Sequence, residues 1–319
     1  MRSFNTVQTA YTTSLKEVLN HGKLVKSVKD KNSVGSYFGS KDRDFIEILG
    51  YSFILNNPLN RLIFSRNRKL SLGFGIANFI WLISGRKDVA TISFYNRFGS
   101  AYSSDGTYYE AAFGNRIFGH LNLWNDAKQL LNMDINSRRA LLPIFIPSDL
   151  KDLPNDTPCA SSIQLMIRGG KLEFFLHMRS QSAAMVFPYD IFLFTMLHEF
   201  FSQQLNIPIG RFHYYCNSFH YYKEEEELVK RIVKEGFYNK SMPSMDSTTF
   251  EVINDLIQIE RQMRESFNGE SAFDIDSLKK LPEYWAELFR VVYHKACIDH
   301  GCNTPECESR YLKLRNTYL

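Results

Sequence analysis

The sequence has few cysteines, no long apolar run and little net charge, and each scarcity excludes a class of protein. No run reaches the roughly 18 apolar residues that cross a bilayer, and residues 1–5 lack the apolar stretch of a secretory signal. Five cysteines in 319 residues favour free thiols in a reducing compartment over a disulfide framework. A net charge of +4 without a basic stripe suits phosphorylated small molecules better than a nucleic-acid polymer. We therefore expect a cytoplasmic protein that binds neither membranes nor nucleic-acid polymers.

Apolar residues make up 44% of the sequence, enough to bury a core in one large domain or in one domain with an extension. Their helical spacing predicts helices over 4–21, 73–84, 190–205, 249–267 and 282–300, and a further helix that begins within 126–131. Strand-like runs cover 45–65, with a turn at 56–58, and then 140–146, 162–168, 171–178 and 211–222. The glycine pair at 169–170 predicts a hairpin turn between two of these strands.

The composition changes after residue 222, where four glutamates at 224–227 open a more polar and helical stretch. We find no internal repeat and no low-complexity segment that would suggest a repeat architecture. The expected organisation is therefore one domain over 1–224 followed by a helical C-terminal extension over 225–319.

A cysteine with a nearby arginine is the strongest chemical signal in the chain. Cys159 follows a proline and precedes a predicted strand, and Arg179-Ser180 follows twenty positions later, beyond the predicted hairpin. A lone cysteine is more often a small buried apolar residue than a nucleophile. A guanidinium beside a thiol favours the thiolate, which is the form that attacks an electrophile. Cys159 is thus a candidate nucleophile with Arg179 as its activating cation.

Further short segments surround this pair in order: 167–172, 178–180, 188–191 and 218–222. Together with Pro158-Cys159 they resemble the core of the thymidylate synthase family, which includes the pyrimidine-nucleotide hydroxymethylases. The resemblance covers residues 4–222 and implies an α+β fold with a large twisted mixed sheet covered by helices. It also implies a homodimer that associates through sheet faces. In the family the Pro-Cys cysteine attacks a pyrimidine ring, which makes Cys159 the expected nucleophile.

The resemblance also implies residues that bind a pyrimidine nucleoside monophosphate. Ser137-Arg138-Arg139 matches a family signature that reaches the substrate phosphate of the other subunit, and paired guanidiniums bind phosphate through forked hydrogen bonds. An Arg-Arg pair alone would be interpreted as a solvated basic loop. His220 and Tyr222 match a family pair that holds the sugar. The expected substrate-binding residues are Arg138, Arg139, Gln164, Arg179, Ser180, Ser218, His220 and Tyr222, with Lys41 or Arg43 as candidates for an N-terminal phosphate-binding arginine.

Asp190 stands where thymidylate synthases carry an asparagine that recognises uracil. A cytosine edge offers an amine donor and a ring-nitrogen acceptor. A protonated aspartic acid can accept from that amine and donate to that nitrogen. Family members that act on dCMP or CMP carry aspartate here, so the resemblance points to a cytosine nucleotide. The alternative is that Asp190 caps the N-terminus of the 191–205 helix, and both roles can coexist.

Several family positions that serve the cofactor and proton transfer are changed. Asn78 occupies the place of a glutamate that orders water and relays protons, and an amide cannot act as a general acid or base. Ser182 replaces an aspartate that binds the folate pterin, Val186 replaces a glycine that leaves room for it, and Phe113 replaces a tyrosine. The resemblance implies 5,10-methylenetetrahydrofolate as cofactor, and these changes place its use in question. The expected catalytic residues are Cys159, Asn78 and Asp190.

Three functions are compatible with this pattern. The resemblance together with Asp190 favours a folate-dependent 5-hydroxymethylase of CMP or dCMP. A 5-methylase of a pyrimidine nucleotide is the first alternative. A nucleotide-binding protein, or an enzyme that no longer uses folate, is the second alternative. The choice between ribose and deoxyribose stays open.

Histidines and cysteines gather near the C-terminus, at His294, Cys297, His300, Cys302 and Cys307. Such residues can bind zinc, but their spacing fits no standard zinc module. We therefore expect no metal site, and we interpret the group as the end of a solvent-facing helix.

Overall fold

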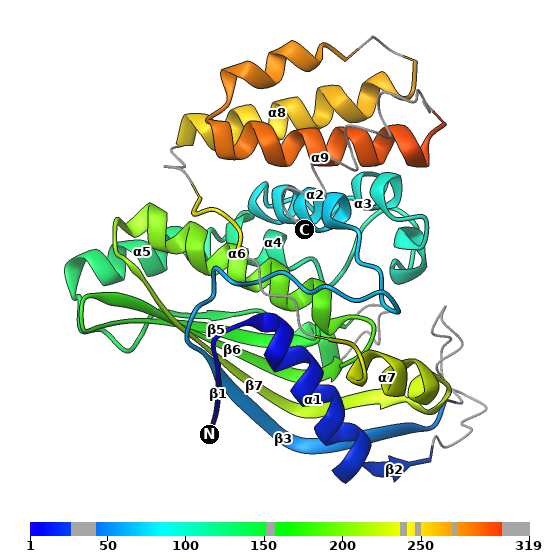
Figure 1. The fold of residues 1–319 in the computed structure, drawn as a ribbon. Coiled ribbons are helices and arrows are strands. Elements are labelled where there is room, and N and C mark those ends of the chain that lie inside the picture. Colours follow the sequence, from blue (N-terminus) through cyan, green and yellow to red (C-terminus); the bar gives the residue numbers. More distant parts are fainter. Residues whose placement is uncertain (27–42, 151–156, 237–240, 246–249, 270–272, 302–319) are drawn as a thin grey trace.

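A twisted seven-stranded mixed sheet forms the base of the molecule in the computed structural model, and helices pack on it (Figure 1). The structure describes residues 1–26, 43–150, 157–236, 241–245, 250–269 and 273–301. The strand order is β1-β3-β7-β6-β5-β4, and β2 pairs with β3. The β1–β3 and β6–β7 pairs are parallel and the other pairs are antiparallel. The α+β architecture expected from the sequence is confirmed.

The strands are β1 (Arg2–Phe4), β2 (Lys23–Val25), β3 (Phe45–Leu55), β4 (Leu141–Pro143), β5 (Ala160–Arg168), β6 (Lys171–Ser182) and β7 (Ile209–Tyr222). The predicted hairpin is present as β5 and β6. Gly169 and Gly170 between them have φ of 58° and 71°, a left-handed pair that glycine adopts without steric cost. Strands β1 and β2 were not predicted, because three residues are too few to show an alternating pattern.

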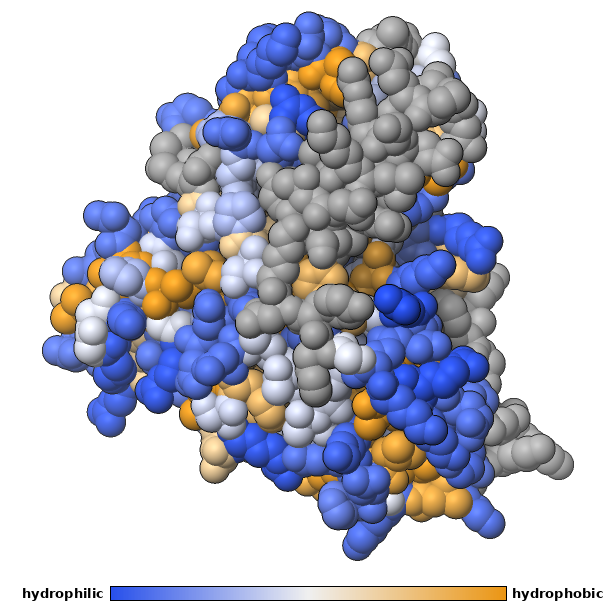
Figure 2. Space-filling view, viewed as in Figure 1, coloured by the Kyte–Doolittle hydropathy of each residue, from blue (hydrophilic) through white to orange (hydrophobic). Residues whose placement is uncertain are grey.

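The helices are α1 (Val7–His21), α2 (Leu72–Ile83), α3 (Val89–Tyr95), α4 (Phe113–Phe118), α5 (Leu123–Met133), α6 (Phe187–Leu205), α7 (Glu226–Val233), α8 (Phe250–Ser266) and α9 (Glu283–Asp299). All helices expected from periodicity are present, whereas the short helices α3 and α4 were not predicted. Figure 1 shows α1 and α7 lying in front of the sheet and α6 above it. From the same side the surface is largely hydrophilic with scattered hydrophobic patches (Figure 2), as expected for amphipathic helices.

The prediction of a second strand after the turn at 56–58, up to residue 65, is wrong. Residues 59–71 are all described and form neither strand nor helix. Their polar groups bond instead to helices: Asn60 accepts from the Val7 amide at 2.9 Å, and the Arg61 side chain forms a buried ion pair with Glu199 on α6 at 2.5 Å. A buried charge needs such a partner, so this segment is held against α6 rather than at a sheet edge.

The side-chain alternation of three neighbouring strands changes at one level of the sheet. On β7, Tyr214 and Cys216 face the core, but beyond them it is Phe219 that does so. The paired β6 positions change in the same way, because Gln181, in register with Phe219, is buried. Opposite this level on β3 lies Gly50, with a φ of 66°. This irregularity changes the direction of the side chains at one end of β6 and β7.

The C-terminal helices share the core of the first part of the chain. Trp285 on α9 is fully buried and stacks on Phe79 of α2, with ring centroids 6.1 Å apart and planes at 9°. Tyr95 on α3 donates to Glu260 of α8 at 3.0 Å. Helices α8 and α9 thus cover α2, as Figure 1 shows. The boundary between 1–224 and 225–319 stays a prediction, and both sides of it contribute to one apolar cluster.

Candidate active site

Strand register gathers the residues of the predicted site at the end of β6 where the alternation changes. The Arg179 amide donates to the Cys159 carbonyl at 2.8 Å. On the other side of β6, Ser180 lies in register with Ser218 of β7. Two residues further along, Ser182 lies in register with His220. Residues far apart in the sequence therefore become neighbours across β5, β6 and β7.

Arg179 holds the backbone of the cysteine segment. Its Nε donates to the Pro158 carbonyl and its Nη2 to the Thr157 carbonyl, each at 2.9 Å. Cys159 is partly exposed, whereas the side chain of Arg179 is exposed. A cysteine whose preceding backbone is held by a guanidinium from the neighbouring strand β6 is an arrangement that suits an activated nucleophile.

Asp190 lies in the first turn of α6, and the helix begins earlier than the sequence suggested. The N-cap residue is Val186, and Pro188 follows within the first turn, where proline is favoured. The expectation that Asp190 caps the helix is therefore wrong. Its Oδ2 instead accepts a hydrogen bond of 2.8 Å from Nε2 of Gln181. Burial raises the pKa of Asp190 to about 6, and the Gln181 bond opposes only part of this rise.

The predicted sugar-binding residues lie at the end of β7. His220 is buried, its Nδ1 lies 3.3 Å from the Ser218 carbonyl, and burial lowers the pKa of its imidazole. The hydroxyl of Ser218 donates to Glu47 on β3 at 2.5 Å. The Arg43 guanidinium lies 3.7 Å from the ring centroid of Tyr222.

Of the two candidates for the phosphate-binding arginine, Arg43 is held by acidic neighbours, and Lys41 lies outside the described residues. Arg43 forms ion pairs with Glu224 and with Glu225, the latter at 3.5 Å. Its charge is therefore partly compensated within the chain, although it remains beside Tyr222.

Arg138 and Arg139 are not brought to Cys159 within one chain. Both are exposed, in the loop between α5 and β4. Gln164 on β5 donates to the Arg138 carbonyl at 2.9 Å. Gln164 alternates with buried neighbours, so it faces away from the helices, and five residues of strand separate it from Cys159 by about 16 Å. Gln164 and the Arg138 backbone are therefore bonded to each other at a distance from Cys159.

Asn78 lies on the less buried side of α2. Asn78 and Phe74, four residues apart on one helix face, are the two residues of α2 that are not buried. Phe74 contacts Tyr189 edge-on at 5.2 Å, and Tyr189 precedes Asp190. This face of α2 therefore lies toward the start of α6.

Three further positions that differ from the family lie at the end of β6, at the start of α6 and on α4. The hydroxyl of Ser182 is buried and has no hydrogen-bond partner in the structure. Val186 is 38% exposed at the start of α6. Phe113 stacks on Phe194 with centroids 5.6 Å apart, so it packs on the α6 core. Ser182 thus offers a polar group that the fold itself leaves unused.

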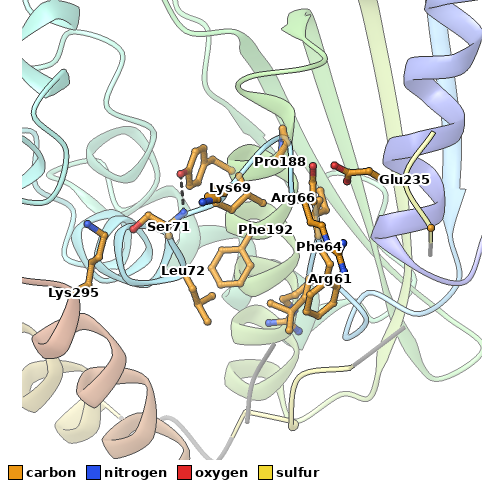
Figure 3. Close-up of a pocket in the computed structure, with 17 residues that line it drawn as sticks. Arg61, Phe64, Arg66, Lys69, Ser71, Leu72, Pro188, Phe192, Glu235 and Lys295 are labelled. Atoms are coloured by element: carbon orange, nitrogen blue, oxygen red, sulfur yellow. Dashed lines mark hydrogen bonds between the residues drawn. The ribbon is translucent and has the colours of Figure 1, made fainter. Parts of the chain in front are cut away.

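A cavity of about 1250 Å³ lies beside the start of α6 (Figure 3). Tyr189 and Phe192 of α6 line it together with Lys69 and Arg66 of the irregular segment and Lys295 of α9. Sequence reasoning missed this cavity. The one available signal was the cluster of basic residues within 66–69, which lies just beyond the strand-like run predicted over 45–65.

The C-terminal histidines and cysteines form no metal site in the part of the chain that the structure describes. His294 and Cys297 are buried in α9, and the ring of His300 stacks on Phe94 at 4.1 Å. The expectation that they mark a solvent-facing helix end is wrong for His294 and Cys297, because that side of α9 packs into the core. Cys302 and Cys307 lie outside the described residues.

A search for membrane-crossing helices finds none among the described residues.

Comparisons with known proteins agree with the resemblance. The family model for thymidylate synthase matches residues 9–264. Two deoxyuridylate hydroxymethyltransferases are similar: that of Bacillus phage SP01 is 22% identical over 75% of this chain and 66% of its own length, and that of Delftia phage PhiW-14 is 25% identical over 73% and 67%. The thermostable thymidylate synthase A of Bacillus subtilis superposes with a TM-score of 0.59 and 17% identity, covering 73% of this chain and 85% of the other. The matched segment thus spans about two thirds of the curated relatives and most of this chain, and the chain belongs to the thymidylate synthase family.

Proposed function

We propose that this protein transfers a one-carbon unit to C5 of a pyrimidine nucleoside monophosphate, as a 5-hydroxymethylase of CMP or dCMP. The observation that carries the proposal is Asp190. Its carboxyl has a pKa of about 6 and shares one end of the sheet with Cys159 and Arg179. The raised pKa makes this carboxyl easier to protonate than an ordinary aspartate, and its neutral form can both donate to and accept from the edge of a base.

The chain's own residues supply the covalent step. The Cys159 thiolate adds to C6 of the ring, the C5–C6 double bond opens, and its electron pair makes C5 nucleophilic. Arg179 favours the thiolate and presents cationic hydrogen-bond donors to the substrate phosphate. His220 and Tyr222 contact the sugar, and the lowered pKa of His220 keeps its imidazole neutral, with one nitrogen to donate and one to accept. After the one-carbon unit has joined C5, loss of the C5 proton and of the thiolate restores the aromatic ring.

The residues beside the site fit a folate cofactor. Folate carries an aromatic ring between its pterin and its glutamate carboxylates. The cavity offers the rings of Tyr189 and Phe192 to the aromatic part, and the cations Lys69 and Lys295 to the carboxylates. Ser182, at the position where the family carries a pterin-binding aspartate, has a buried hydroxyl without a hydrogen-bond partner and does not itself line this cavity. When bound, methylenetetrahydrofolate supplies the methylene group that C5 takes up.

Asn78 supports a hydroxymethyl product rather than a methyl product. It lies on the less buried face of α2, toward the start of α6. Its amide can hold a water molecule without exchanging protons with it, and water is the group that completes hydroxymethylation. The names of the two phage relatives also support hydroxymethyl transfer. A methylase would instead deliver hydride to the same carbon.

We further propose that the active protein is a homodimer that associates through the sheet face opposite the helices. On that face Phe175 stacks on His213 at 4.2 Å and His177 on Tyr215 at 4.9 Å, and most of these rings remain partly exposed. Gln164, which bonds the Arg138 carbonyl, is about 16 Å from Cys159 along its own strand. In a symmetric dimer the guanidiniums of Arg138 and Arg139 would reach the phosphate in the partner's site.

The alternative base is uracil, favoured by the printed names of the phage relatives, which act on deoxyuridylate. A neutral Asp190 carboxyl can donate to the uracil O4 and accept from its N3–H. A nucleotide-binding protein that no longer uses folate is favoured by the changes at Asn78 and Ser182.

The deciding experiment incubates the protein with methylenetetrahydrofolate and CMP, dCMP, UMP or dUMP tritiated at C5. Released tritium is counted and the product masses are measured, with Cys159→Ala as the inactive control. Tritium release from CMP or dCMP with the mass gain of formaldehyde is expected. Release from uridine nucleotides alone would identify the alternative base. No release from any nucleotide that binds would refute the proposed reaction.

A further inference from the structure

A buried chain of hydrogen bonds ends at the carboxyl that is proposed to recognise the base. Tyr214 on β7 donates from its hydroxyl to Oε1 of Gln181 at 3.1 Å, and Nε2 of Gln181 donates to Oδ2 of Asp190 at 2.8 Å. Gln181 and Tyr214 are each 1% exposed, so water does not compete for these bonds. Neither residue belongs to the motifs identified in the sequence.

The direction of the chain follows from the chemistry of its members. A glutamine amide has a donor end and an acceptor end, and its orientation is set by the partner that can act in one sense only. Tyr214 has one proton to donate. That proton goes to Oε1 of Gln181, and burial keeps the Tyr214 hydroxyl protonated because it raises the pKa of this group. With Oε1 of Gln181 accepting from Tyr214, Nε2 of the same amide is directed to Asp190.

The consequence for Asp190 is that its two oxygens become different. Oδ2 already accepts from Gln181, so the proton of a neutral carboxyl resides on Oδ1. The cytosine edge needs its donor and acceptor contacts in the reverse order from the uracil edge. Cys159 and the sugar contacts set the orientation of the base. In that fixed orientation, a carboxyl whose proton could move between its two oxygens would bind either base.

We propose that Gln181 and Tyr214 are positioning residues that fix the proton of Asp190 on one oxygen and thereby determine which pyrimidine base is bound. The inference rests on the proposed function, because it takes Asp190 as the group that contacts the base. It does not depend on which of the two bases is preferred.

Removing the tyrosine hydroxyl should loosen this control without removing the ring. In Tyr214→Phe the stack on Phe53, with centroids 4.8 Å apart, can be kept. The Gln181 amide is then free to turn, and its oxygen can take the Asp190 proton. We expect the preference between bases to fall roughly tenfold, the equivalent of one hydrogen bond. Gln181→Met, which leaves Oδ2 without its donor, should have a similar effect.

Tyr51→Phe is the matched control. Tyr51 is a buried tyrosine on the neighbouring strand β3, it stacks on Phe219 at 4.7 Å, and its hydroxyl bonds Ser14 at 2.9 Å. Tyr51→Phe removes the same kind of buried hydrogen bond as Tyr214→Phe, but Tyr51 does not belong to the hydrogen-bonded chain that ends at Asp190. Its base preference should equal that of the wild type.

The measurement is the ratio of dissociation constants for cytidine and uridine monophosphates, in the ribose and deoxyribose forms, by titration calorimetry without folate. A lowered ratio in Tyr214→Phe and Gln181→Met, with Tyr51→Phe unchanged, supports the inference. An unchanged ratio in either folded variant refutes it, as does a wild type that binds both bases equally. If Tyr214→Phe does not fold, Gln181→Met decides. Binding requires no turnover, so the positioning role can hold even where the proposed reaction fails.

Discussion

Replacing Asp190 by asparagine should make the fold more stable at alkaline pH, and the structure sets the size of the effect. The pKa of this carboxyl is about 6 in the folded chain against an ordinary value of 3.8. The folded state therefore binds the proton more tightly than the unfolded state, so ionisation costs stability as the pH rises. Each pKa unit corresponds to about 1.4 kcal/mol, so the cost approaches about 3 kcal/mol above pH 7 and vanishes below about pH 3. At pH 5 roughly half of it is present.

Asparagine keeps the shape of the neutral acid and can accept from Gln181, but it does not ionise. The variant should exceed the wild type in free energy of unfolding by about 3 kcal/mol at pH 8 and by about half of that at pH 5. Urea denaturation at both pH values and at one protein concentration measures this difference.

Asp149→Asn is the control of opposite sign. Asp149 is buried against Arg116, with oxygens at 2.6 and 2.7 Å, and its pKa is lowered in spite of burial because Arg116 and the Ile146 amide bond it. Asp149→Asn should lower the free energy of unfolding at neutral pH. This decrease should become smaller as the pH falls. If Asp190→Asn is no more stable than the wild type at pH 8, the pKa of the Asp190 carboxyl is not raised by folding, and the argument for base recognition fails.

Three further predictions test other parts of the structure. If the dimer shares its sites, Arg139→Ala and Cys159→Ala will each be inactive alone, and an equal mixture refolded together will regain about a quarter of wild-type activity; a mixture as inactive as its components would refute sharing. Trp285→Ala should lower the free energy of unfolding by about 3–5 kcal/mol in urea titrations, because the fully buried ring stacks on Phe79; a loss below about 1 kcal/mol would mean that the C-terminal helices stabilise the rest little. Lys69→Gln should raise the KM for folate about three- to fivefold while leaving the nucleotide KM unchanged, and steady-state kinetics would refute the cavity assignment if only the nucleotide KM moved.

The sequence by itself determined the local structure and the order of the motifs. Helices such as α6 follow from apolar spacing, and the β5–β6 hairpin follows from the two glycines, because both signals act between residues close in the chain. The family could be recognised in the same way, since Pro158-Cys159 and the segments around Arg179 and His220 are short and ordered. The start of α6 was predicted three residues too late, because its first turn is stabilised by Pro188 rather than by a capping side chain.

The tertiary structure alone decided how these pieces meet. The register of β6 and β7 and the change in their alternation bring Gln181 and Tyr214 to Asp190, and no pattern within either strand announces such a contact. The cavity joins Lys69 to Lys295 across more than two hundred residues of chain. The separation of Arg138 from Cys159 likewise depends on the pairing of β4 with β5. These are contacts between distant segments, and their energies arise from packing and burial that are settled only when the whole chain is folded.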